Sequence, residues 1–333
     1  MQNASDTMNR STMMPEALDN GYDEAVCIVA DAEATARRLD AVLGYGVVHR
    51  GPCDPGFLAL LGIDGVQGGG WREVTVLQPQ AARGRMRLIE PPGPVPPVRR
   101  MGAQPWDVGG FFDVSVRALG PIDDLLAAFC RNGFSAFAPV ADFEMAGLCV
   151  REALAHDADG LCFAMAQRIA PPLAGWDHIK GPASNPFNSV ITVESLEAAK
   201  HLFIDGLGWQ VVVDTALVHA DGRNVMGLPR NLARERPVRL AIVQQEGRME
   251  GSIELIEYPC EPLDFRGDQT HWRGIAALCF PVRDLQGILA RADGAGCATG
   301  APRMVDWAGR GAVRAGWMMT PWAARLVFYE VQA

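Results

Sequence analysis

The sequence predicts an α+β fold made of four units, each consisting of a strand, a helix and three further strands. Two observations support this prediction. Similar segments recur along the chain at nearly constant spacing, and each recurrence changes from strand-like alternation to helix-like spacing of its apolar residues. With 333 residues, of which 49% are hydrophobic, the chain is long enough for about two domains with cores of their own.

The clearest recurrence relates residues 24–44 to residues 188–208. Each segment starts with an apolar strand, enters a helix after Asp31 or Ser195, and ends with Leu-Gly. Two further pairs of similar segments follow in the same order: 86–90 with 253–257, and 114–119 with 280–285. The chain therefore contains a first and a second unit, which the third and fourth units repeat.

Apolar residues at spacings close to 3.6 predict one buried helix face in the first and third units. They are Ala32, Ala36, Leu39 and Leu43, and Leu196, Ala199, Phe203 and Leu207. Gly44 and Gly208 then end these helices, because glycine readily takes the left-handed conformation needed just after a helix. Alternation of apolar residues predicts strands within residues 238–243 and 253–256.

Proline-rich segments mark the expected boundaries between units. Six prolines lie from Pro91 to Pro105, and four more lie in residues 170–186. We expect a disordered tail at 1–21, a first domain of two consecutive units at 22–168, a linker at 169–186 and a second domain of two units at 187–333.

The charge balance limits the partners of the protein. A net charge of −9 without a basic block argues against nucleic acid or an anionic membrane as a partner. No apolar run approaches the ~18 residues of a membrane helix, and the N-terminus lacks the apolar stretch of a secretory signal. We expect a cytoplasmic protein with a small-molecule substrate, and a homodimer is compatible with the sequence.

Four such units in two pairs resemble the vicinal oxygen chelate superfamily, which includes glyoxalase I, bleomycin-resistance proteins, methylmalonyl-CoA epimerase and extradiol dioxygenases. The resemblance covers roughly residues 22–332 and rests on the strand–helix–Leu-Gly pattern and on the strand Ile-Glu-Leu-Ile-Glu at 253–257. It implies two cup-shaped barrels of mixed β-sheet with helices outside. It also implies that a divalent metal usually lies inside a cup, and the doubled barrel is most similar to the dioxygenases.

The resemblance places eight residues at the cup positions where metal ligands are expected. On first strands these are Glu24, Phe111, Asn188 and Ala277, and on last strands they are Arg87, Ala164, Glu254 and Tyr329. None is a histidine, although borderline metals prefer imidazole or several carboxylates. We therefore expect no metal and no other cofactor, with a divalent metal as the alternative.

In the first domain, Glu24 and Arg87 are expected to form an ion pair where the metal would lie. The alternative is that Arg87 is exposed at the rim of the barrel. Asp113 would face the same cup and is, with Glu24, a candidate substrate-binding residue.

In the second domain, Glu254, Asn188 and Tyr329 form the candidate catalytic cluster, and His271 is a candidate substrate-binding residue. Glu254 lies on an otherwise apolar strand, where desolvation would raise the pKa of its carboxyl group toward that of a general base at neutral pH. The alternative is that Glu254 pairs with an arginine or lysine across the sheet.

We therefore expect an enzyme with an altered, metal-free site that catalyses proton transfer, as an isomerase, epimerase or lyase does. Its substrate would be a small carbonyl-bearing or aromatic molecule, with Glu254 as the base and Asn188 and Tyr329 orienting the substrate oxygen. One alternative is an extradiol-type ring-cleavage dioxygenase. Another is a non-catalytic protein that binds or sequesters small molecules such as drugs.

Overall fold

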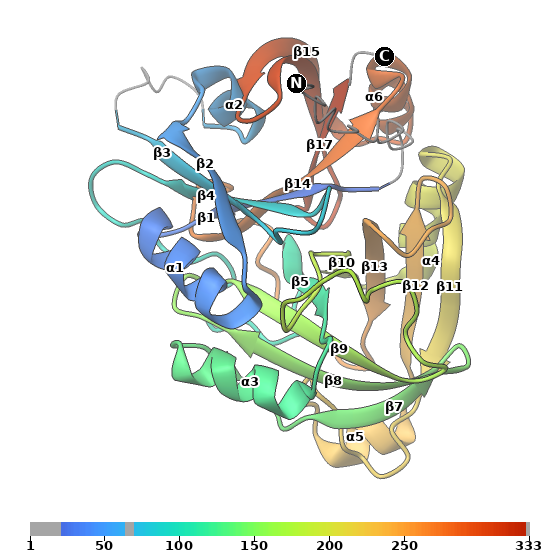
Figure 1. The fold of residues 1–333 in the computed structure, drawn as a ribbon. Coiled ribbons are helices and arrows are strands. Elements are labelled where there is room, and N and C mark those ends of the chain that lie inside the picture. Colours follow the sequence, from blue (N-terminus) through green and yellow to red (C-terminus); the bar gives the residue numbers. More distant parts are fainter. Residues whose placement is uncertain (1–20, 64–69, 331–333) are drawn as a thin grey trace, which may run out of the picture.

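Two curved β-sheets with helices packed against them make up the protein, in a computed structural model that describes residues 21–63 and 70–330 (Figure 1). One sheet has eight strands and the other nine. The predicted α+β class is confirmed, as are the four units in the expected order. Residues 1–20 of the predicted tail lie outside the described residues. Gly21, also assigned to that tail, is buried, and its amide donates to Gln245 Oε1 over 2.8 Å.

Each unit begins with a strand that leads into a helix. The first unit contains β1 (Glu24–Ile28), α1 (Ala32–Leu43), β2 (Gly46–Pro52), α2 (Pro55–Leu60), β3 (Arg72–Leu77) and β4 (Arg85–Glu90). The second contains β5 (Phe111–Arg117), α3 (Ile122–Arg131), β6 (Ser135–Ala136), β7 (Ala141–Met145), β8 (Leu148–His156) and β9 (Cys162–Ala170). The third contains β10 (Asn188–Thr192), α4 (Leu196–Lys200), η1 (His201–Gly206), β11 (Gln210–Leu217), α5 (Arg230–Glu235), β12 (Val238–Gln244) and β13 (Ser252–Glu257). The fourth contains β14 (Gly274–Val282), α6 (Leu285–Gly294), β15 (Ala298–Trp307), β16 (Gly311–Met319) and β17 (Arg325–Glu330).

The first and third units enter and leave their helices as the sequence predicts. The side chains of Asp31 and Ser195 accept hydrogen bonds from backbone amides in the first turn, at 2.8 and 3.2 Å. Gly44 takes a left-handed conformation (φ 73°), and its amide donates to the Asp40 carbonyl oxygen. β2 can therefore begin at Gly46, with only two residues between it and the end of α1.

The pairing of the units differs from the prediction of two consecutive domains at 22–168 and 187–333. β1 pairs antiparallel with β14, so the first and fourth units form one sheet, here called barrel I. β5 pairs antiparallel with β10, so the second and third units form the other, here called barrel II. The sequence could not distinguish the two arrangements, because every first strand is fully buried and offers the same kind of apolar edge.

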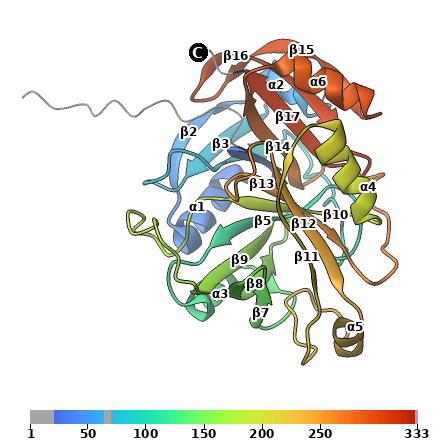
Figure 2. The same ribbon diagram turned by 90° about the vertical axis from the view of Figure 1, so that its right-hand side faces the viewer.

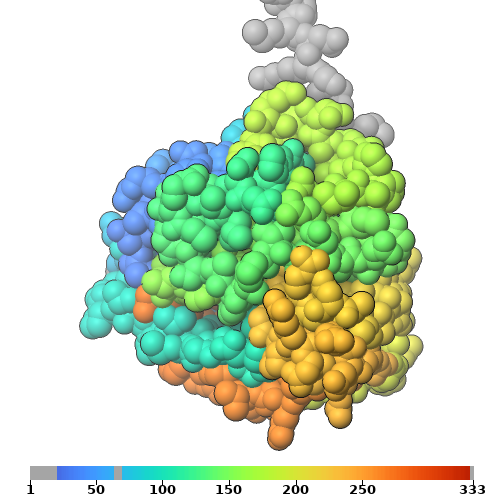
Figure 3. Space-filling model, turned by 90° about the horizontal axis from the view of Figure 1, so that it is seen from below, coloured from blue at the N-terminus to red at the C-terminus, as the bar shows by residue number. Residues whose placement is uncertain are grey.

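The linker predicted at 169–186 does not separate two domains, because residues 171–187 join β9 to β10 within barrel II. The chain crosses between the barrels in two other segments, 91–110 and 258–273. These segments run beside each other, since Val98 forms a bridge with Arg273 and Val108 with Asp264. Seen from below, the second and third units, coloured green to yellow, lie side by side (Figure 3).

A shared apolar core joins the two barrels. It contains buried residues from all four main helices and from both sheets. Across this core α1 contacts α3, and α6 contacts η1, which continues the helix begun by α4. Figure 2 shows α4 and α6 on the same side of the molecule. These helices therefore cover the outer faces of the sheets, whereas α2 packs on the concave side of barrel I, where Phe57 contacts Trp307 and Arg87.

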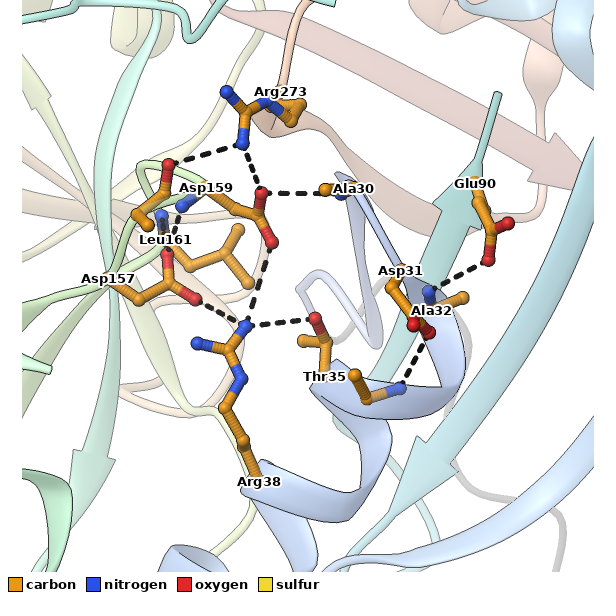
Figure 4. A network of polar contacts seen from close by, with 12 residues as sticks. Ala30, Asp31, Ala32, Thr35, Arg38, Glu90, Asp157, Asp159, Leu161 and Arg273 are labelled. Atoms are coloured by element: carbon orange, nitrogen blue, oxygen red, sulfur yellow. Dashed lines mark hydrogen bonds and ion pairs between the residues drawn. The ribbon is translucent and has the colours of Figure 1, made fainter. Parts of the chain in front are cut away.

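Ion pairs support the same contact between the barrels. Asp159, in the turn before β9, accepts from Arg273 over 2.7 Å and from the Ala30 amide over 3.2 Å. Arg38 on α1 lies 2.9 Å from Asp157 and 3.6 Å from Asp159 (Figure 4). Side chains of barrel I and of the second crossing segment thus hold one turn of barrel II.

Candidate functional site

The cup of barrel I is filled by its own side chains. Arg87 Nε donates to Glu24 Oε1 over 2.6 Å, and Arg87 Nη1 donates to Glu73 Oε2 over 2.8 Å. Trp307 Nε1 donates to the second oxygen of Glu24 over 3.1 Å, and the ring of Phe57 lies 4.1 Å from the Arg87 guanidinium. The predicted Glu24–Arg87 ion pair is confirmed. The alternative of a rim-exposed Arg87 is wrong, because this side chain is completely buried.

The charges in barrel I neutralise one another. Burial alone would raise the pKa of Glu24, but the positive charge of Arg87 holds that pKa below its usual value. Glu24 is therefore a structural anion rather than a substrate-binding residue, which corrects the sequence-based expectation.

Tyr329 also lies in barrel I, because β17 pairs with β14. Its hydroxyl donates to Asp23 Oδ2 over 2.7 Å. It therefore does not join Glu254 and Asn188, and its assignment to their cluster is wrong. Ala277 packs in the same filled cup.

Barrel II, in contrast, encloses a cavity. The centres of water molecules can occupy about 120 Å³ of it, whereas one water needs roughly 10–15 Å³ of such space, so a small organic molecule has room. Most of its wall is apolar and comes from both units: Phe112, Phe143, Met145, Leu148, Val150, Leu154, Leu217, Val225, Met226, Val238, Leu240 and Ile242. The polar residues of the wall are Asp113, Ser115, Arg117, Glu152, Arg168, Asn188, His219, Glu254 and Tyr258.

Strand register brings the polar side chains together. Side chains alternate along a strand, so Asp113, Ser115 and Arg117 share the concave face of β5. Asn188 on β10 lies opposite Ser115, and Glu254 on β13 lies beside Val190, two residues after Asn188. Carboxyl groups from separate units therefore meet in one cavity.

Asn188 holds Glu254 in a defined orientation. The side-chain amide of Asn188 donates to Glu254 Oε2 over 2.8 Å, and its Oδ1 accepts from the Ser189 amide and from Ser252 Oγ. Glu254 forms no ion pair within the described part of the chain, so the alternative of a cross-sheet partner is wrong. Asn188 already has its polar atoms engaged and acts as a positioning residue for this carboxyl group.

Three carboxyl groups in the cavity bind protons unusually tightly. Burial raises the pKa of Glu254 to about 7, against the hydrogen bond from Asn188. Burial and then the charge of Glu254 raise the pKa of Asp113 to about 8, although Ser115 and the Val190 amide oppose this. Burial, followed by Glu254 and Asp113, raises the pKa of Glu152 well above its usual value. Near neutral pH the cavity therefore holds both proton acceptors and proton donors.

Two other predicted positions fall outside this cavity. His271 is exposed in the second crossing segment, so its assignment to substrate binding is wrong. His271 lies three residues before β14, which begins at Gly274. Phe111 faces the shared core, and its neighbour Phe112 lines the cavity instead. Ala164 does line the cavity, as expected.

The sequence did not lead us to four polar residues that line the cavity: Glu152, His219, Arg117 and Arg168. Alternation along residues 148–156 and 162–170 is the signal for two of them, because it places Glu152 on the same face as Leu154 and Arg168 on the same face as Ala164. His219 Nε2 is buried without a hydrogen-bond partner among the described residues, and burial lowers the pKa of this imidazole. A neutral ring nitrogen is thus available to a ligand.

The donors of barrel II do not fit the divalent metal that the resemblance implies. Within residues 21–63 and 70–330, no three His, Cys, Asp or Glu side chains form a group that could hold a metal ion. The expected absence of a bound metal stays a prediction. No helix in the same residues has the length and apolar character needed to cross a membrane.

Comparison with solved structures supports the fold. Glyoxalase I from Zea mays is similar with a TM-score of 0.60 and 13% identity, over 93% of this chain and 92% of that chain. A candidate dioxygenase from Bacillus subtilis is similar with a TM-score of 0.55 and 12% identity, over 94% of this chain and 86% of that chain. No protein-family model and no curated protein matches the sequence. At these identities the likeness is one of fold: the chain has the two-barrel fold of the vicinal oxygen chelate superfamily.

Proposed function

We propose that the protein is an enzyme that moves protons on a small carbonyl-bearing molecule in the cavity of barrel II. The observation that carries this proposal is the pair Glu254 and Asp113. These two carboxyl groups have pKa values of about 7 and about 8 within a largely apolar cavity. Enzymes use such pairs for acid–base chemistry at neutral pH.

The ionised carboxylate of Glu254 takes a proton from the carbon next to the substrate carbonyl. The protonated carboxyl group of Asp113 donates its proton to the carbonyl oxygen, which forms an enol instead of a free enolate. Return of the proton from Glu254 to a different carbon, or to the other face of the same carbon, gives an isomer or an epimer, while the enol hydroxyl returns its proton to Asp113 and the carbonyl forms again. No atoms are gained or lost, and no oxidant is needed.

Solvent exchange tests this proposal before the natural substrate is known. The protein is incubated in D₂O with a panel of aryl-substituted ketones, 2-oxo acids and 1,3-diketones, and deuterium next to the carbonyl is followed by NMR. Glu254→Gln keeps the shape of the side chain but removes the base, so we expect exchange to fall by about 100-fold or more while folding is retained. A Glu254→Gln variant with unchanged exchange would contradict the assignment.

Glu144→Gln is the matched control for this experiment. Glu144 lies on β7 between Phe143 and Met145, which line the cavity, but its own side chain is exposed on the opposite face. We expect its exchange rate to equal that of the unmodified protein.

A second candidate function is non-catalytic binding of an apolar small molecule. The wall of the cavity favours it, because flexible methionines such as Met145, Met226 and Met249 can adapt to different ligands. Tight binding without any deuterium exchange across the panel would favour this function. A ring-cleavage dioxygenase is less compatible, because the usual ligands of its iron are two histidines and a carboxylate in one group, and the described residues form no such group.

A further inference from the structure

We infer that the substrate of barrel II carries a carboxylate, which Arg117 and Arg168 bind at one end of the cavity. This inference rests on the proposed function, since it names the class of molecule on which Glu254 acts. It draws on residues that take no part in the proton transfer itself.

Arg117 is held in place with one nitrogen unused. The residue is only 7% exposed, and its Nη2 donates to Glu250 Oε1 over 2.7 Å. Its guanidinium lies 3.8 Å from the ring centre of Phe187 and 4.9 Å from that of Trp176. Nη1 is buried and has no hydrogen-bond partner in the described residues. A buried donor without a partner is unfavourable, so a ligand acceptor at this position would be stabilising.

Arg168 reaches the same end of the cavity from β9. Ala164, Ala166 and Arg168 alternate along the concave face, and β9 runs parallel to β5 with Ala166 opposite Arg117. Arg168 is half-buried and forms no hydrogen bond or ion pair through its side chain with any described residue. The two small alanines leave space beside both guanidinium groups.

The charges at this end do not balance. Burial and the nearby charge of Arg168 lower the pKa of Arg117, while Glu250 opposes this change. Glu250 is the carboxylate that contacts Arg117, and it is also attracted by Arg83. Two guanidinium groups facing one carboxylate, with Arg83 also near that carboxylate, leave at least one excess positive charge. A monoanion such as a carboxylate would neutralise it, and the planar guanidinium suits its two oxygens.

The spacing of the strands relates the carboxylate to the reacting carbon. Asn188, which holds Glu254, lies opposite Ser115. Arg117 follows two residues later, at about 7 Å along the strand. The carboxylate therefore lies a few bonds from the acidic carbon, and the apolar wall around Phe143 and Leu148 accommodates the remainder. The substrate class is thus a small oxo-carboxylate with an apolar substituent.

Paired probes of the same shape test the inference. Binding of phenylacetate and of the neutral phenylacetamide is measured by calorimetry at pH 7. We expect phenylacetate to bind about tenfold more tightly or better, because only the anion forms ion pairs with the two arginines, whereas the neutral amide accepts hydrogen bonds without a charge of its own. Equal affinities for the two probes would overturn the inference.

Arg168→Met removes the charge but keeps an apolar stem of similar length. We expect this variant to lose most of the preference for phenylacetate. Arg117→Lys is a second variant, which retains the positive charge but loses the paired N–H donors of the guanidinium. The matched control is Arg151→Met, on the opposite face of neighbouring β8, where Arg151 pairs with Asp123 and Asp142. The inference fails if Arg151→Met reduces the preference as much as Arg168→Met does.

The result is separable from that of the proposed function. Glu254→Gln should lose deuterium exchange and keep the preference for phenylacetate, whereas Arg168→Met should lose the preference. If the unmodified protein shows the preference but exchanges no probe, the carboxylate site stands and the proton-transfer proposal fails. If it exchanges deuterium without any preference, the reverse holds.

Discussion

At the scale of single residues, the buried carboxyl group of Asp113 links the proposed proton transfer in barrel II to the stability of the fold. In the unfolded chain this carboxyl group has an ordinary pKa near 4, whereas burial raises the pKa to about 8 in the folded protein. Between these values the folded state binds the proton and the unfolded state does not. Rising pH therefore destabilises the fold across this range.

We predict that Asp113→Asn weakens this pH dependence, because the amide stays neutral at every pH. Relative to the unmodified protein, the variant should gain stability between pH 5 and pH 9, on the order of a few kcal/mol. Part of the slope should remain, since the raised pKa of Glu254 acts in the same direction. Chemical denaturation at a series of pH values measures the effect.

Asp142→Asn is the control for this experiment, because Asp142 is exposed on the outer face of the same sheet. Its stability curve should run parallel to that of the unmodified protein. Parallel curves for Asp113→Asn as well would mean that Asp113 is ionised in the folded state, and the proposed acid would be lost.

At the scale of the elements, β1 and β4 of barrel I carry Glu24 and Arg87 where barrel II has an open cavity. The ion pair, Glu73 and the aromatic rings of Phe57 and Trp307 fill this cup. Because these charges are completely buried, each depends on its partners. The strands of barrel I therefore enclose a packed interior, while those of barrel II line a cavity.

We predict that Arg87→Ala destabilises the protein by roughly 3–5 kcal/mol, because it leaves Glu24 and Glu73 buried without their counter-charge. Thermal unfolding should show a clearly lower melting temperature, while phenylacetate binding in barrel II persists in the folded protein. Arg72→Ala on the adjacent strand is the control, since its ion pair with Glu90 is exposed and should matter little. An unchanged melting temperature for Arg87→Ala would contradict the structural role.

Local sequence patterns were sufficient to predict the helices and strands, but not which first strands pair with one another. Alternation and helical spacing are properties of a few neighbouring residues, so they were enough to predict the units. The Glu24–Arg87 and Asn188–Glu254 contacts could also be predicted, because each joins the first and last strands of a single unit. Tyr329 was misplaced because its position depends on which first strands pair, and β1 meets β14 from about 250 residues away. Glu152 and Arg168 meet in one cavity because the whole sheet of barrel II is curved, and this curvature cannot be read from any one segment of the sequence.

At the scale of the whole molecule, the shared core joins both barrels into one cooperative unit. Arg38, Arg273 and the Ala30 amide all converge on Asp159 across that contact. Separation of the barrels would expose a broad apolar surface, which is unfavourable in water.

We predict a single calorimetric unfolding transition for the protein, and we expect Asp159→Ala to lower its midpoint without splitting it. The loss should be roughly 1–3 kcal/mol, because Arg273 keeps partial access to water after its partner is removed. Asp264→Ala, which removes an exposed ion pair with Arg266 in the second crossing segment, should leave the midpoint unchanged. Two separate transitions in the unmodified protein would show that the barrels unfold independently.

The pairing of the first unit with the fourth also sets the order in which the chain can be completed during synthesis on the ribosome. Barrel II is encoded by a continuous stretch, and all of its strands exist once β13 has been made. Barrel I must wait for β14 to β17, so β1 to β4 emerge long before the strands that close their sheet. Barrel II, which encloses the cavity, can therefore fold first. The sheet of barrel I can be completed only after the last four strands have been made.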